Sequence, residues 1–291
     1  MVKRLLKIVS ILILLALVVA GVFFYSIYIS VDRVNLSYQN LTSTKIPTEM
    51  NDIKIAYISD IKYNSFMDKE RLTSMISELN DTGSDVVIFG GDMFDTPDKK
   101  APDSTITAEI TEILKSIDAP LGKFAVLGDQ DLVNEETKTL VSSILYNSDF
   151  EIITNTIVRL RNQSNSSISL IGLDSLVNGT PDVASAFSKI NNDEYNLLIT
   201  HCPDLLKNND INTQYIDTAI TGHSLGGQIY LPLFGPLHTV TGAEKYNHGT
   251  YDINKMTLFV SNGLGTTETD MRLFAPPQIL IFKLHHGTNK A

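Results

Sequence analysis

The sequence predicts an α/β protein in which one apolar helix precedes a single domain built from layered sheets. Three observations carry this prediction. The residues from Ile8 to Val31 contain no charge, strand-like apolar runs alternate with helical segments from residue 53 onward, and a hairpin-like pattern interrupts that alternation in the middle of the chain. A chain of 291 residues with 43% hydrophobic residues can bury one large core.

The N-terminal apolar segment is 24 residues long, which is enough to cross a bilayer. Lys3, Arg4 and Lys7 precede it and Asp32 follows it, so we expect a cytoplasmic N-terminus and an extracytoplasmic domain. We interpret residues 1–31 as a single-pass transmembrane signal anchor. A cleaved signal peptide is the alternative, because "VVA" at 18–20 offers small residues, but the apolar run continues for ten residues beyond it.

The first half of the domain alternates strands with helices. A polar connector is expected at 32–51, a domain at 52–285 and a tail at 286–291. Strands are predicted at 53–59, 85–91 and 123–128, and helices at 69–80, 104–117 and 135–147. The helix at 69–80 has Asp68 as its N-cap and apolar residues at helical spacing.

The second half adds a different pattern. Short β runs flank the polar turn "NQSNSS" at 162–167, which indicates a second sheet or part of one. Strands then end at His201 and just before His223, a short helix is expected after Pro203, and the runs at 255–265 and 276–284 are β-like.

Charge and cysteine content restrict the partners and the compartment chemistry. Without the three N-terminal cations, 20 basic side chains face 33 acidic ones, a formal charge of −13. This balance argues against nucleic acid as a partner. The single cysteine, Cys202, allows no internal disulfide.

Titratable side chains follow five of the predicted strands: Asp60, Asp92, Asp129, His201 and His223. The carboxyl ends of strands in an α/β sheet form one edge, so we expect these side chains to lie close together. An aspartate at a strand end is individually common as a turn former. As a set they are the ligands that Zn²⁺, Mn²⁺ or Fe²⁺ prefers.

The same residues lie in five short motifs. These are "SDIK" at 59–62, "GGDMFD" at 90–95, "GDQD" at 128–131, "THCPD" at 200–204 and "GHSLGGQ" at 222–228. In order and spacing they resemble the blocks of calcineurin-like metallophosphoesterases, over roughly residues 52–285. The segments "GGQIYLPLFG" and "SNGLGTTETDMRLFAPPQI" also resemble the membrane-anchored bacterial branch of that family.

The resemblance implies a four-layer αββα sandwich that binds two metal ions and hydrolyses phosphomonoesters or phosphodiesters. This chain departs from the family pattern in the ligands of the first ion, where Lys62 and Leu225 replace histidines. The ligands that the family uses for the second ion have counterparts in Asp92, Asp129, His201 and His223. We therefore expect one divalent ion, Mn, Fe or Zn, and regard a second ion as doubtful.

Two further positions are candidates for substrate binding. Lys62 could supply one positive charge near Asp60 and Asp92, although a lysine in an ordinary salt bridge is an equally good interpretation. Gln130 occupies the position of the family's catalytic histidine; it can hydrogen-bond a phosphate but cannot donate a proton at neutral pH. No catalytic residue is identified from the sequence.

Two functions fit these observations. The first is a membrane-anchored metallophosphoesterase that acts on a phosphate-containing small molecule or lipid. The alternative is a catalytically inactive family member that serves as a ligand-binding or scaffold module at the membrane surface.

Overall fold

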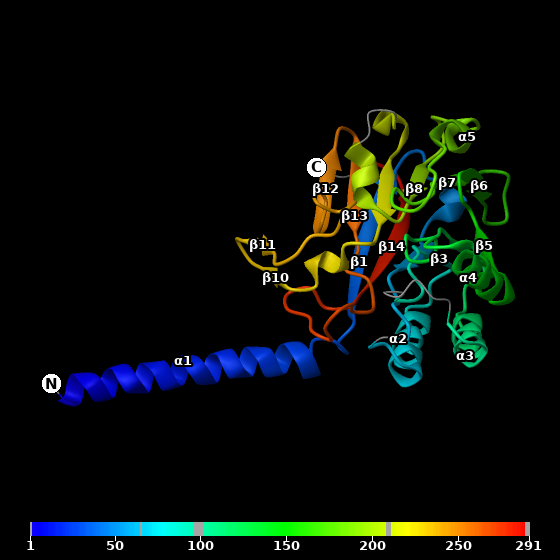
Figure 1. Cartoon of the computed structure of the whole chain (residues 1–291). Helices are drawn as coiled ribbons and strands as arrows, with labels where there is room; N and C mark the ends of the chain where they lie inside the picture. The colour runs from blue at the N-terminus through cyan, green and yellow to red at the C-terminus, as the bar shows by residue number, and fades with distance from the viewer. Residues whose placement is uncertain (1, 65, 96–101, 208–210, 289–291) are drawn as a thin grey trace.

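The computed structural model describes residues 2–64, 66–95, 102–207 and 211–288. Helix α1, Val2–Tyr28, extends away from the rest of the molecule (Figure 1). Within those ranges it is the one helix long and apolar enough to cross a membrane. The predicted membrane-spanning segment is therefore one continuous helix as far as Tyr28, with residues 29–31 in a turn, and the direction in which it crosses a membrane stays a prediction.

The first sheet has six strands, and it contains the strands that precede the predicted aspartates. Its order is β1 (Asn35–Ser43), β14 (Gln278–His286), β2 (Lys54–Ile58), β3 (Val86–Phe89), β4 (Gly122–Ala125) and β5 (Phe150–Ile152). Strands β2 to β5 are parallel, while β14 runs antiparallel to β2. Strands β2 and β3 are fully or almost fully buried, as their unbroken apolar sequences predict.

The second sheet also has six strands and supplies the two histidines. Its order is β12 (Gly249–Ile253), β13 (Met256–Val260), β9 (Thr218–Thr221), β8 (Asn196–Ile199), β7 (Ile168–Gly172) and β6 (Thr156–Leu160). Strands β6 and β7 form the antiparallel hairpin that was predicted around the polar turn. A separate small hairpin consists of β10 (Tyr230–Leu231) and β11 (Gly235–Pro236).

Helices cover the outer faces of both sheets, so the molecule has four layers. Helices α2 (Lys69–Asp81), α3 (Ser104–Lys115) and α4 (Glu135–Asn147) gather on one side (Figure 1) and share a buried core with the first sheet. Helix α5 (Val183–Phe187) and short 3₁₀ turns pack on the outer face of the second sheet. A third core lies between the two sheets. The predicted αββα architecture is confirmed.

Sequence features explain where the helices begin. The side chains of Asp68, Asp103 and Asn134 accept hydrogen bonds from backbone N–H groups in the first turns of α2, α3 and α4. In α2 the buried residues fall three or four apart, so one stripe faces the sheet: Leu72, Met75, Ile76 and Leu79. The predicted helix after Pro203 is a 3₁₀ turn, η2 (Pro203–Lys207).

The prediction of a polar connector at 32–51 is wrong for part of that stretch. Residues 35–43 form β1, which pairs in parallel with all nine residues of β14. This strand was not predicted from the sequence because it lacks an apolar pattern: β1 lies at the sheet edge, and Leu41 is its one buried residue. The first sheet therefore includes chain from before residue 52.

Candidate metal centre

The candidate site lies where loops from both sheets meet. Asp60, Asp92 and Asp129 follow β2, β3 and β4 of the first sheet, while His201 and His223 follow β8 and β9 of the second. All five side chains are buried. The edge predicted from the strand ends is thus shared between two facing sheets.

Four of these side chains form one compact cluster. Asp92, Asp129, His201 and His223 can each offer one ligand atom, and these atoms all lie within 4.8 Å of one another. His201 Nε2 lies 3.3 Å from Asp92 Oδ2 and 3.2 Å from Asp129 Oδ1. His223 Nδ1 lies 2.8 Å from Asp129 Oδ1 and 3.2 Å from His201 Nε2.

Backbone carbonyl groups orient both imidazoles. His201 Nδ1 lies 2.7 Å from the carbonyl oxygen of Gly90, and His223 Nε2 lies 2.8 Å from that of Thr241. Each of these nitrogens donates to its carbonyl, which leaves the other ring nitrogen facing the cluster. In the neutral tautomer, His201 Nε2 and His223 Nδ1 present lone pairs toward the carboxylates.

The buried oxygens give a test of whether a metal ion fits. Asp60 Oδ1 is buried and accepts no hydrogen bond, and the atoms that face buried Asp129 Oδ1 are the imidazole nitrogens His223 Nδ1 and His201 Nε2, which can donate to it only when they are protonated. A buried acceptor without a donor is costly, so these atoms need a proton or a cation. Two carboxylates and two imidazoles form a donor set that suits Mn²⁺, Fe²⁺ or Zn²⁺. The residues present therefore fit one divalent ion.

The protonation of the cluster follows from its charges. Burial alone lowers the pKa of His201, but the carboxylates of Asp92 and Asp129 outweigh it and raise that pKa well above its usual value. Burial likewise opposes the charge on His223, while its hydrogen bond with Asp129 raises the pKa to about 10. Burial raises the pKa of Asp129, but the two imidazoles lower it by more, so its pKa lies below the usual value. Without a metal ion, protons on the imidazoles neutralise the carboxylates.

Asp60 and Lys62 lie beside the cluster. Asp60 Oδ2 accepts from Ser59 Oγ at 2.6 Å and from the backbone N–H of His223 at 3.0 Å, and its Oδ1 lies 3.9 Å from His201 Nε2. The Lys62 ammonium forms a buried ion pair with Asp92 Oδ2. Burial opposes its charge, but Asp92, Asp60 and Asp129 together raise the pKa of Lys62 above its usual range.

Gln130 also borders the centre. Gln130 donates from its backbone N–H to Asp92 Oδ1 at 2.9 Å and from Nε2 to Asp129 Oδ2 at 3.0 Å. The Leu225 side chain is buried. The structure thus brings together the predicted metal ligands and the two candidate substrate-binding residues, Lys62 and Gln130.

Sequence reasoning missed the supporting role of Asp131. Its Oδ2 accepts from the backbone N–H groups of Asp92 and Gly128, both at 2.8 Å, and its Oδ1 accepts from that of Met93 at 2.9 Å. This carboxylate joins the loops after β3 and β4, which carry two of the candidate ligands. Its place at the end of "GDQD" is the signal that could have identified it.

Arg272 is a second residue that the sequence did not single out. Its guanidinium is fully buried and donates to the carbonyl oxygens of Ala275, Asn262 and Leu225 at 2.7, 2.9 and 3.3 Å. Burial lowers the pKa of Arg272 to about 9. Its backbone N–H donates to the carbonyl oxygen of Ser26 at 3.0 Å, so this residue connects the end of α1 with the loop after His223.

The backbone of the site is strained. Asp60, Lys62, Asp92 and His223 all have positive φ, between 51° and 70°, which side chains with a Cβ rarely adopt. Gly128 is required for another reason, since a Cβ there would lie 2.1 Å from Asp92 Oδ1. Strain of this kind, about 1–3 kcal/mol per residue, tends to concentrate at functional sites.

Comparison with known proteins gives relatives that match most of the chain. No family model matches the chain. It is 28% identical to the uncharacterized metallophosphoesterase YkuE of Bacillus subtilis, over 92% of both chains. It is 26% identical to the uncharacterized metallophosphoesterase Cj0846 of Campylobacter jejuni, over 93% of this chain and 69% of the relative. The chain is therefore similar over nearly its whole length to proteins named metallophosphoesterases, in line with the resemblance of its five motifs.

Two more matches extend the comparison. The UDP-2,3-diacylglucosamine pyrophosphatase LpxG of Chlamydia muridarum is 22% identical over 80% of this chain and 84% of that protein. The solved structure of TT1561 from Thermus thermophilus matches with a TM-score of 0.46 and 13% identity, over 74% of this chain and 91% of the other.

Proposed function

We propose that this protein is a membrane-anchored phosphoesterase that works with one divalent metal ion, held by Asp92, Asp129, His201 and His223. The observation that carries the proposal is the buried cluster of these four side chains, whose potential ligand atoms all lie within 4.8 Å of one another. When bound, such an ion polarises a phosphoryl oxygen and lowers the pKa of coordinated water. The imidazoles are already oriented for ligation by Gly90 and Thr241.

Lys62 takes the place of a second ion in this proposal. Its ammonium is paired with Asp92 and lies close enough to Asp60 for that carboxylate to raise its pKa. One positive charge there partly compensates the buried carboxylates and is available to a phosphate oxygen. In this proposal Gln130, whose Nε2 donates to Asp129 Oδ2 at 3.0 Å, supplies a second hydrogen bond to the substrate.

The proposed reaction is slow. Gln130 stands where the family has its catalytic histidine and cannot protonate a leaving group. Loss of a general acid typically costs about 10²–10⁴ in rate. A substrate whose leaving group needs no proton, such as an aryl phosphodiester, avoids this cost.

The substrate is proposed to be a phosphate compound at the membrane surface, either a lipid or a small molecule. Helix α1 supports this placement, because its last turn is hydrogen-bonded to Arg272, which also contacts the loop after His223. The relative LpxG is named for a pyrophosphatase activity on a diacylated sugar nucleotide, which agrees with a lipid-linked phosphate.

The test is hydrolysis of an aryl phosphodiester by the purified full-length chain with added Mn²⁺. We expect slow, metal-dependent turnover that His223→Ala abolishes. The matched control is His238→Ala, which removes an exposed imidazole outside the cluster. If the wild type shows no turnover above buffer in excess Mn²⁺, the proposal fails, and the alternative of a binding or scaffold module replaces it.

A further inference from the structure

The β10–β11 hairpin carries an exposed apolar tip. Leu233 is fully exposed, Phe234 is 86% exposed and Leu237 is 69% exposed. No Asp, Glu, Lys or Arg occurs between residues 218 and 243, in a chain where 19% of residues are charged. Large apolar side chains gathered on an uncharged protrusion are typical of an interaction surface.

The hairpin points in the same direction as the anchor helix. Figure 1 shows β10 and β11 projecting from the domain on the side from which α1 leaves, toward the N-terminal end of α1. The end of α1 is held against the domain, because the backbone N–H of Arg272 donates to Ser26 and the Arg71 guanidinium donates to the carbonyl oxygen of Val31. A bilayer crossed by α1 would therefore face the hairpin tip.

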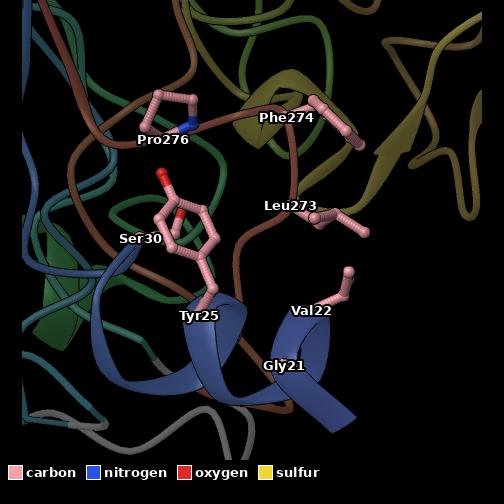
Figure 2. A pocket seen from close by; sticks show the side chains of 7 residues that line it. All are labelled: Gly21, Val22, Tyr25, Ser30, Leu273, Phe274 and Pro276. Atoms are coloured by element: carbon pink, nitrogen blue, oxygen red, sulfur yellow. The ribbon is translucent and has the colours of Figure 1, made fainter. Parts of the chain in front are cut away.

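An apolar hollow beside α1 adjoins the segment to which the base of the hairpin is bonded. A hollow of about 540 Å³ lies between the end of α1 and the segment 273–276. Its lining side chains, which are mainly apolar, are drawn in Figure 2. Phe274 at its rim is 58% exposed. The next residue back, Leu273, accepts a hydrogen bond from Tyr230 N–H at 2.9 Å, so the base of the hairpin is fixed to the same segment.

The backbone of the tip suits an apolar environment. Pro232 and Pro236 have no N–H group to desolvate. The N–H groups of Phe234 and Leu237 donate to the carbonyl oxygens of Leu231 and Ile229, at 3.0 and 2.9 Å. Few donors would therefore lose water without gaining a partner.

We propose that the tip of the β10–β11 hairpin inserts into the interfacial region of the lipid bilayer, as a second membrane contact beside α1. Leucine and phenylalanine on an uncharged tip suit this depth. The contact fixes how the domain faces the membrane, and since the hairpin begins seven residues after His223, it places the candidate metal centre near the headgroups. The proposal does not depend on hydrolysis.

The chain contains no tryptophan, so one substitution introduces a single fluorescent reporter. The full-length Phe234→Trp variant is reconstituted into vesicles of phosphatidylcholine and phosphatidylglycerol, with and without brominated acyl chains. We expect a blue-shifted emission and a loss of fluorescence with the brominated lipids. The control is Tyr146→Trp on α4, where the native side chain is 79% exposed, and it should show neither effect.

Two results would overturn the proposal. Emission from Phe234→Trp that matches the Tyr146→Trp control places the tip in water. A blue shift without quenching by brominated lipid places the tip against protein, either a second copy of this chain or another partner. The Leu233→Trp variant repeats the measurement at the neighbouring exposed position and should give the same result as Phe234→Trp.

Discussion

At the scale of single residues, the centre is defined by buried charges that compensate one another. The Lys62 ammonium is paired with Asp92. By the family resemblance, a second metal ion would be expected near this position. Removing one partner of a buried pair leaves an uncompensated charge, which typically costs about 3–5 kcal/mol. Lys62 is therefore a structural requirement of the metal-free protein as well as a candidate substrate ligand.

Replacing Lys62 with methionine should lower the free energy of unfolding by about 3–5 kcal/mol in the presence of a chelator, because Asp92 then loses its buried ion pair with the Lys62 ammonium. Urea denaturation in detergent micelles, followed by circular dichroism, measures this. Lys138→Met is the control, since Lys138 lies in an exposed pair with Glu135 on α4. A loss no larger than that of the control would show that Lys62 carries no such role.

Asp131→Asn tests the carboxylate that joins the two ligand-bearing loops. In the wild type both carboxylate oxygens of Asp131 accept from backbone N–H groups. In the variant an amide NH₂ group replaces one of these oxygens and cannot accept. Hydrogen bonds to a charged group contribute about 1.5–3 kcal/mol, so we expect a loss of that size in stability together with weaker Mn²⁺ binding. Asp118→Asn, at an exposed position, should change neither quantity. Unchanged Mn²⁺ affinity would rule out the positioning role.

At the scale of helices and strands, the sequence was informative where the signal is local. An N-cap and apolar periodicity were sufficient to predict α2, and apolar runs were sufficient to predict β2, β3, β8 and β9. The strand ends also identified the region of the site. Long-range pairing could not be read in this way, since β1 and β14 are separated by more than two hundred residues and β1 is largely polar.

Some parts of the site were equally inaccessible from the sequence. Whether Asp60 joins the four-residue cluster or lies beside it depends on how the two sheets face each other, which no local pattern encodes. Arg272 was missed because its partners are backbone carbonyl groups, which every residue has and which no sequence pattern identifies.

The junction between α1 and the domain gives a prediction at this scale. The Arg71 guanidinium on α2 donates to Val31 and pairs with Asp32 and Asp270, with contacts at 3.0 and 3.1 Å to the two carboxylates. Arg71→Ala should expose the junction to limited proteolysis. Arg33→Ala, which removes an exposed arginine of the same junction, is the control. Equal cleavage rates in the two variants would show that Arg71 does not hold the helix.

At the scale of the whole molecule, the candidate centre connects the two sheets, because its aspartates come from one and its histidines from the other. A metal ion bound only to the folded state stabilises it by mass action, by about 2.7 kcal/mol when its free concentration is a hundred times the Kd. Mn²⁺ should therefore raise the midpoint of thermal unfolding of the wild type. In the His201→Ala variant, Mn²⁺ should leave the midpoint of thermal unfolding unchanged. An equal rise in that variant would show that the stabilising ion binds outside the candidate centre.

Elemental analysis of the purified full-length chain tests the proposed one-ion centre most directly. We predict one divalent ion per chain in the wild type, none in His223→Ala, and two in the double variant Lys62→His, Leu225→His. Two ions in the wild type would contradict the role given to Lys62. No ion in the wild type would contradict the metal centre itself.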